Sequence, residues 1–175
     1  MWQKNMTKKA QIPMAYVGLG SNLGERAAHL LLAVRGMLEA GLEVVRLSAI
    51  YETEPLDYTA QPDFFNQVAA VRVGAYTPEQ VLARLLRIEY QLGRRRDIPC
   101  GPRTIDLDLL LYGDVVQDTE LLTLPHPRLA LRRFVLTPLA EIAPAVCHPV
   151  SGHTMRELLA NVPDTSKVRR RKDEG

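Results

Sequence analysis

Hydrophobic and polar residues recur along the chain with two periods, one typical of helices and the other of strands. Between residues 25 and 40, apolar side chains return every three or four positions, which predicts a helix that ends at Gly41. A second helix is predicted over residues 77–92, because Thr77-Pro-Glu-Gln80 forms a capping box with proline at the first helical position. Alternating patterns predict four strands, at residues 15–19, 42–51, 65–73 and 104–112.

These elements follow one another as strand, helix, strand, strand, helix, strand. The order predicts an α+β fold, a ferredoxin-like βαββαβ sandwich in which helices pack on one face of an antiparallel sheet. Residues 113–162 add a C-terminal hairpin and short helices, and the loop over 52–63 is long enough to serve a ligand. With 175 residues, we expect one domain over 15–163, a flexible N-terminal extension over 1–14 and a basic flexible tail over 164–175.

Composition and charge exclude several classes of protein. Hydrophobic residues make up 46% of the chain, yet no run approaches the roughly 20 apolar residues of a membrane span. We therefore expect a globular cytoplasmic protein with no membrane partner. Cys100 and Cys147 lie far apart without metal-site spacing, which predicts neither a disulfide nor a zinc site. The net charge is +2, but basic ends leave a body of about −4, which argues against a nucleic-acid partner.

The most informative local pattern is the last predicted strand, Thr104-Ile-Asp-Leu-Asp-Leu-Leu-Leu-Tyr112. With a period of two, one face of this strand carries Ile105, Leu107, Leu109 and Leu111. Asp106 and Asp108 then lie side by side on the other face. Two adjacent carboxylates repel one another unless a cation lies between them, so the pair is a candidate Mg²⁺ site with room for substrate phosphates. The alternative is the polar face of a half-exposed strand.

Arginines cluster around this carboxylate pair. Every basic residue in the body of the chain is an arginine, and seven of them fall between Arg94 and Arg133. Guanidinium groups offer planar, paired donors that suit phosphate oxygens, so the cluster favours a metal-phosphate centre. His126, in Leu-Pro-His-Pro-Arg, is either structural or a phosphate contact. The glycine-rich segment 18–24 matches neither a Walker loop nor a dinucleotide fingerprint, and we interpret it as a turn in which Ser21 or Asn22 caps the helix that follows.

Five motifs together resemble the 6-hydroxymethyl-7,8-dihydropterin pyrophosphokinase family of folate synthesis. They are Gly20-Ser-Asn-Leu-Gly24, Asp63-Phe-Phe-Asn66, Arg87-Ile-Glu-Tyr-Gln-Leu-Gly-Arg94, Gly101-Pro-Arg-Thr-Ile-Asp-Leu-Asp108 and Leu124-Pro-His-Pro-Arg128. The resemblance runs from about Ala15 to Val162 in the order of the family, and the fourth motif is nearly diagnostic. It implies an ATP-dependent diphosphotransferase that moves the diphosphoryl group of ATP onto the hydroxymethyl group of the pterin and releases AMP, with no obligate protein partner.

The resemblance also implies roles for individual residues. Asp106 and Asp108 match the ligands of two Mg²⁺ ions, and Arg94 and Arg103 match catalytic positions beside them. The positions around ATP match Glu89, Arg94, Arg96, Arg103, Leu109, Thr123, His126 and Arg132. The positions around the pterin match Thr53, Leu56, Phe64, Asn66 and Phe134, with the two phenylalanines as a stacking pair. Cys100 stands where some relatives have a tryptophan that covers the closed site, and the loop over 97–100 is short.

Two other classes of protein share part of this pattern. A nucleotidyltransferase also places acidic residues on a ferredoxin-like sheet over two metals, but it releases pyrophosphate. An RNA-recognition domain has the same sheet with exposed aromatic residues on its central strands, whereas the exposed strand positions here are Asp106 and Asp108. The nucleotide product therefore distinguishes the three readings.

Overall fold

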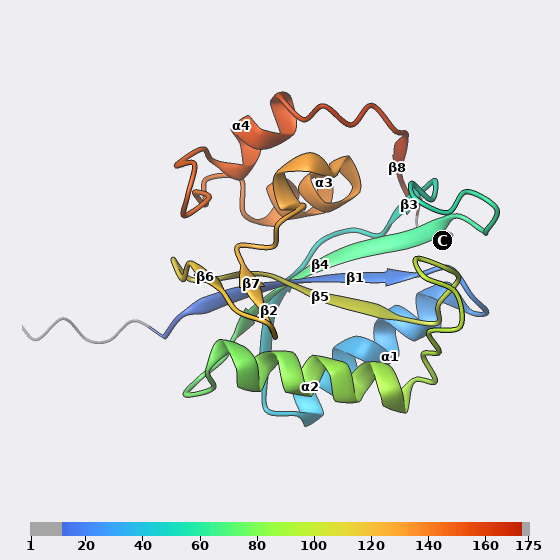
Figure 1. Ribbon diagram of the computed structural model, residues 1–175, viewed down its shortest axis with the longest axis horizontal. Helices are drawn as coiled ribbons and strands as arrows, with labels where there is room; N and C mark the ends of the chain where they lie inside the picture. Colours follow the sequence, from blue (N-terminus) through green and yellow to red (C-terminus); the bar gives the residue numbers. More distant parts are fainter. Residues whose placement is uncertain (1–11, 173–175) are drawn as a thin grey trace, which may run out of the picture.

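The computed structural model describes residues 12–172, and Figure 1 shows the arrangement of the elements. The strands are β1 (Met14–Ser21), β2 (Glu43–Leu47), β3 (Tyr51–Thr53), β4 (Phe64–Arg72), β5 (Asp106–Tyr112), β6 (Gln117–Asp118), β7 (Thr123–Leu124) and β8 (Val168–Arg170). The helices are α1 (Arg26–Glu39), α2 (Pro78–Gln91), α3 (Arg133–Ile142) and α4 (Met155–Ala160), and a 3-10 turn covers Leu129–Leu131.

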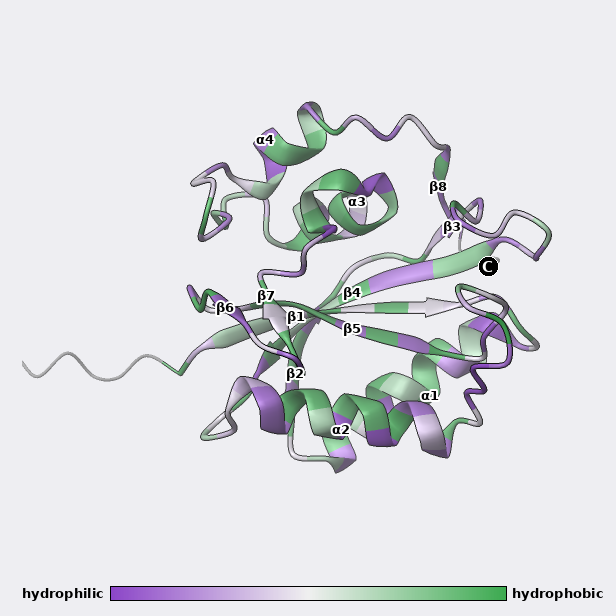
Figure 2. Ribbon diagram, viewed as in Figure 1, coloured by the Kyte–Doolittle hydropathy of each residue, from purple (hydrophilic) through white to green (hydrophobic). Residues whose placement is uncertain are grey.

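The main sheet is antiparallel and has the order β5-β1-β4-β3-β8, with β2 also paired to β4. The helices α1 and α2 cover one face, as predicted, and Figure 1 shows α3 and α4 over the opposite face. One hydrophobic cluster lies on the α1/α2 side and a second on the α3/α4 side. Figure 2 shows α3 as predominantly hydrophobic, which fits its packing against the sheet. The predicted ferredoxin-like α+β fold is confirmed, with the C-terminal helices as a third layer.

The strand predicted over residues 42–51 is wrong as a single element, because it divides into β2 and β3. Both parts pair with β4, where Leu47 faces Ala69 and Tyr51 faces Asn66. Residues 48–50 therefore lie opposite only residues 67 and 68 of β4, so the first strand carries one extra residue at the break. The Oγ atom of Ser48 accepts a hydrogen bond from the main-chain N–H of Val68 at 2.9 Å, which satisfies β4 across the break.

A bulge in β5 corrects the predicted faces of that strand. Val17 pairs with Leu109 and Tyr16 with Leu111, so Leu110 is an extra residue on β5. Leu107 and Leu109 belong to the core under α1 and α2, but Leu110 and Leu111 both belong to the core under α3. The prediction that Leu111 shares a face with Leu109 is wrong for this reason. Asp106 and Asp108 precede the bulge and line the pocket on the α3 side.

The helix termini agree with one prediction and correct another. In α2, the Oγ1 atom of Thr77 accepts from the N–H of Gln80 at 3.2 Å, and the Gln80 side chain accepts from the N–H of Thr77 at 3.0 Å. The capping box is therefore confirmed. For α1, the N-cap residue is Glu25, which makes no side-chain capping bond. Capping by Ser21 or Asn22 is therefore wrong, and the Asn22 side chain bonds to other loops instead.

The C-terminal segment differs from the predicted flexible tail. Val168–Arg170 form β8 on the outer edge of β3, and the N–H of Arg171 donates to the Ile50 carbonyl at 2.8 Å. The unpaired main-chain groups of an edge strand provide the partners for this addition. The predicted extension over 1–14 lies mostly outside the described residues, and β1 begins at Met14. Among the described residues, no helix combines the length and apolarity needed to cross a membrane.

Candidate functional site

A pocket lies at the loop end of the sheet, on the side covered by α3. Its floor comes from β1, β4 and β5, and its walls come from the β3–β4 loop, the loop before β5 and the start of α3. Its lining includes Gly20, Thr53, Leu56, Asp57, Gln61, Phe64, Asn66, Cys100, Arg103, Asp106, Asp108, Arg132 and Phe134. The floor thus combines the central strands β1 and β4 with the edge strand β5, while loops form the walls.

Gly20 allows three pocket side chains to approach the floor closely. A Cβ atom at this position would lie 3.1 Å from Oδ1 of Asn66, 3.7 Å from the Phe64 ring and 3.9 Å from Cβ of Asp106. A side chain at this position would have to displace Asn66 by a few tenths of an ångström, so glycine favours this close packing. The glycine-rich segment therefore contributes more than the turn that the sequence predicted.

All five residues predicted around the pterin line this pocket. Asn66 is buried on β4, and its Nδ2 atom donates to Oγ1 of buried Thr53 at 2.6 Å. This bond fixes the orientation of the amide. Phe64 at the start of β4 and Phe134 in the first turn of α3 line the pocket from the sheet and from the helix above it. Leu56 lies in the β3–β4 loop and is exposed.

The two strand carboxylates differ sharply in their surroundings. Asp106 accepts from Arg94 at 2.6 Å through Oδ1 and from Arg103 at 3.1 Å through Oδ2. Asp108 has no hydrogen-bond or ion-pair partner among the described residues. Burial, followed by repulsion from Asp106 and Glu89, raises the pKa of Asp108 to about 7. The pair therefore combines a neutralised carboxylate with one that lacks a cation.

A buried ion network connects Asp106 to α2. Nη1 of Arg94 also donates to Oε1 of Glu89 at 2.6 Å, and the same carboxylate accepts from the N–H of Leu107 at 2.8 Å. Arg96 approaches Glu89 at 3.5 Å from an exposed position. Burial raises the pKa of Glu89 despite these partners. Glu89 therefore occupies the outer edge of β5 rather than the lining of the pocket.

Several of the positions predicted around ATP follow the same outer edge of β5. The N–H of His126 donates to the carbonyl of Leu110 at 2.9 Å, just as Glu89 accepts from Leu107. The side chain of Leu109 is buried in the α1/α2 core, so a side-chain contact with a nucleotide is not available there. Alternate residues of a strand direct their main-chain groups to the same edge, so Leu109 presents its N–H beside that of Leu107. Leu109 therefore offers only main-chain groups to a ligand at this edge.

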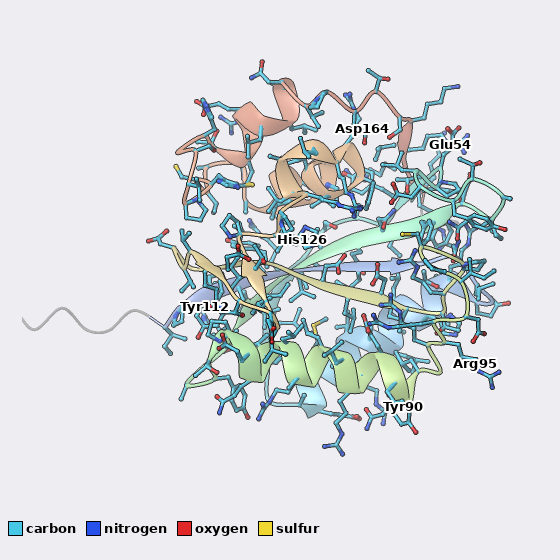
Figure 3. All side chains as sticks on the ribbon, in the orientation of Figure 1. Glu54, Tyr90, Arg95, Tyr112, His126 and Asp164 are labelled. Carbon is cyan, nitrogen blue, oxygen red and sulfur yellow. The ribbon has the colours of Figure 1, made fainter. Side chains whose placement is uncertain are left out.

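His126 and Thr123 have partners of their own. Burial, followed by repulsion from Arg132, lowers the pKa of His126 to about 4, so its imidazole is neutral at physiological pH. Its Nδ1 atom accepts from the N–H of Arg128 at 3.2 Å, and Figure 3 places this residue between the sheet and α3. Thr123 donates through Oγ1 to Asp118 at 2.8 Å. A charged histidine contact with phosphate is therefore not supported.

Sequence reasoning missed a hydrogen-bonded junction between the loops. The Asn22 amide donates to Oε1 of Gln61 and to the Pro62 carbonyl, both at 3.0 Å, and accepts from the N–H of Arg103 at 2.8 Å. Gln61 in turn donates to the Cys100 carbonyl at 3.0 Å. These bonds connect the β1–α1, β3–β4 and 94–105 loops. The signal in the sequence was an amide side chain within a glycine-rich turn.

Comparison with known proteins identifies related sequences across most of the chain. A family model described as 7,8-dihydro-6-hydroxymethylpterin-pyrophosphokinase matches residues 16–144. A protein of Methylorubrum extorquens named 2-amino-4-hydroxy-6-hydroxymethyldihydropteridine pyrophosphokinase is 44% identical over 157 residues, which cover 89% of this chain and 97% of that protein. The Aquifex aeolicus protein of the same name is 39% identical over 142 residues, covering 81% and 88%.

Other relatives are much longer than this chain. The folic acid synthesis protein fol1 of Pneumocystis carinii is 41% identical over 149 residues, which cover 85% of this chain but only 20% of that protein. A crystal structure of Plasmodium falciparum HPPK-DHPS with pteroate superposes with a TM-score of 0.68 at 16% identity, covering 88% of this chain and 44% of that one. This last likeness supports the fold alone.

Proposed function

This chain belongs to the 7,8-dihydro-6-hydroxymethylpterin-pyrophosphokinase family, and on that premise we propose that it is an ATP-dependent diphosphotransferase. It transfers the diphosphoryl group of ATP to the hydroxymethyl group of 6-hydroxymethyl-7,8-dihydropterin and releases AMP. It acts in the cytoplasm without an obligate protein partner. The strongest support is that one pocket holds the carboxylate pair, two arginines and the five predicted pterin residues.

Asp106 and Asp108 are the proposed ligands of two Mg²⁺ ions. Carboxylate oxygens suit Mg²⁺, which keeps several water or phosphate ligands of its own. The fit rests on Asp108, whose partly buried carboxylate lacks a cationic partner and carries a pKa raised to about 7. Among residues 12–172, no cluster of three or more His, Cys, Asp or Glu side chains could hold a metal, so the remaining ligands come from ATP and water. Bound Mg²⁺ neutralises the charge that develops on the transferring phosphates.

The pterin occupies the part of the pocket between Phe64 and Phe134. Two aromatic rings in one pocket, one from the sheet and one from α3, suit the faces of a flat heterocycle. The Asn66 amide group donates to Thr53, so its Oδ1 atom is left to accept from the N–H groups on the polar edge of the pterin. Leu56 closes the loop side.

The nucleotide lies along the outer edge of β5, and its phosphates cross the strand toward Asp106 and Asp108. Glu89, Thr123, His126 and the main chain of Leu109 border the nucleoside part. Four arginines surround the phosphates, namely Arg94, Arg96, Arg103 and Arg132. Since Arg94 and Arg103 already contact Asp106, they stand beside the place where negative charge arrives. Transfer of a phosphoryl group depends chiefly on such positioning and electrostatic stabilisation.

The reaction exchanges one oxygen-phosphorus bond for another. The hydroxymethyl oxygen of the pterin attacks the β-phosphorus in line with the oxygen that bridges the α- and β-phosphates. The new bond forms as the bridging bond breaks, the bond electrons leave with AMP, and the hydroxyl proton passes to solvent. Phe64, Asn66 and Phe134 hold the acceptor, and the arginines hold the donor, so both reactants meet in one geometry.

The identity of the nucleotide product tests this proposal. The protein is incubated with ATP, Mg²⁺ and the reduced pterin alcohol, and the products are followed by phosphorus NMR. We expect AMP and a diphosphorylated pterin in equal amounts, and no product when Mg²⁺ is chelated. ADP would instead indicate an ordinary kinase, and pyrophosphate a nucleotidyltransferase. The Asp108→Asn variant, which keeps the side-chain volume, serves as the matched inactive control.

A further inference from the structure

Asp57 joins the two walls of the pocket through ion pairs. Its Oδ2 atom lies 3.5 Å from Nη2 of Arg132 and 3.7 Å from Nη1 of Arg128. Asp57 belongs to the β3–β4 loop, whereas the two arginines flank the 3-10 turn that leads into α3. The contact therefore connects the β3–β4 loop with the segment that leads into α3 and Phe134.

Arg132, one of the two arginines in this contact, also lies where it can bind a phosphate. Arg132 is 19% exposed, lines the pocket, and stands 5.5 Å from the centre of the Phe134 ring. Within the described residues, Asp57 provides the only carboxylate that pairs with it. A guanidinium group binds a carboxylate and a phosphate through the same N–H donors. Arg132 cannot satisfy Asp57 and a nucleotide phosphate with the same donors at once.

We propose that Asp57 is an internal competitor of the nucleotide for Arg132, and that this pair closes the ligand-free pocket. The inference rests on the proposed function, because it takes a nucleotide polyphosphate as the competing anion. Arrival of the phosphates transfers Arg132 from Asp57 to the ligand, which frees the β3–β4 loop to accommodate the second substrate. Asp57 is thus a positioning residue, since it acts through Arg132.

The expected size of the effect follows from exposure. Asp57 is 54% exposed and both of its ion pairs are long, so the pairs stabilise the closed state only weakly. A competing interaction raises the apparent Kd of a ligand, because the intrinsic Kd is divided by the fraction of protein in the open, binding-competent state. Removing the charge of Asp57 should therefore tighten nucleotide binding about two- to five-fold.

The test compares Asp57→Asn with Glu54→Gln, a change of equal charge in the same loop. Glu54 is exposed, also lines the pocket and has no ion-pair partner among residues 12–172, so its change removes a pocket charge without breaking an ion pair. Figure 3 shows it at the loop end of the molecule. Calorimetry measures the binding of α,β-methylene ATP with Mg²⁺, because the methylene group replaces the bridging oxygen that transfer would break. The same two substitutions are then measured in an Arg132→Gln background, which forms a double-mutant cycle.

We expect Asp57→Asn to bind the analogue about two- to five-fold more tightly, Glu54→Gln to bind like wild type, and the gain to disappear in the Arg132→Gln background. Hydrogen exchange in residues 54–63 should also become faster in ligand-free Asp57→Asn. An equal gain in both variants, no gain, or a gain that survives Arg132→Gln would overturn the role of Asp57 while leaving the proposed function intact. Absence of nucleotide binding in every protein, wild type included, would overturn both.

Discussion

Replacing Asp108 with asparagine should stabilise the ligand-free protein while abolishing its activity. The folded-state pKa of about 7 lies above the ordinary value of 3.8 because burial disfavours the charged carboxylate. At 1.36 kcal/mol per pKa unit, this difference corresponds to about 4 kcal/mol when the group is ionised. Because the side chain keeps some contact with solvent and its surroundings relax, we expect a gain of about 1–3 kcal/mol for Asp108→Asn at pH 8.

The pH dependence gives this prediction a distinctive form. A carboxyl whose pKa is raised on folding binds more protons in the folded state, so wild-type stability falls as the pH rises from about 4 to about 7 and is constant above. The advantage of Asp108→Asn should accordingly be largest above pH 7 and disappear below about pH 4. Added Mg²⁺ should stabilise the wild type more than the variant, because only the wild type retains both proposed ligands.

Urea denaturation in buffers with a metal chelator, at pH 4, 6 and 8, measures the effect directly. The matched control is Asp114→Asn, which removes an exposed carboxylate that has no ion pair among the described residues. A variant no more stable than wild type at pH 8, or a gain of equal size at pH 4, would refute the account of a strained carboxylate. Unchanged Mg²⁺-dependent turnover in Asp108→Asn would refute its role in the site.

Three further outcomes test the rest of the site. Calorimetry of Phe64→Ala and Phe134→Ala should each show pterin binding weakened by roughly 1–3 kcal/mol with ATP affinity little changed, and an equal loss for both ligands would mean that the rings serve only as core. Gly20→Ala places a Cβ atom 3.1 Å from Asn66, so strain of about 1–3 kcal/mol should appear as a higher KM for the pterin; an unaltered KM would show that the floor has room. Deleting residues 167–175 removes β8 from the edge of β3. Thermal unfolding should then show a lower Tm, and pterin titration should show weaker binding. A shortened chain with the Tm and pterin affinity of wild type would mean that β8 does not stabilise the site.

The elements whose signals are local could be predicted well from the sequence. The capping box of α2 depends on four consecutive residues, and the carboxylate pair depends only on the two-residue period of β5. The resemblance of the motifs then led to the five pterin positions, which the fold brings into one pocket. Each of these features is determined by neighbours along the chain or by a short fixed spacing within a motif.

Features that depend on distant parts of the chain could not be predicted in the same way. The bulge at Leu110 depends on the register between β1 and β5, and β8 forms because the edge of β3 is open. The pairing of Asp57 with Arg132 depends on where two loops end, since the residues are 75 positions apart in the sequence. The hydrophobic period of an element and the capping of a helix depend on residues a few positions apart. Strand register, pairing at a sheet edge and contacts between loops depend on residues that come together only after the layers have packed. Local sequence patterns were therefore enough for the two main helices, most of the central strands and the chemistry available to the site, whereas the packing of the layers set which charges face one another across it.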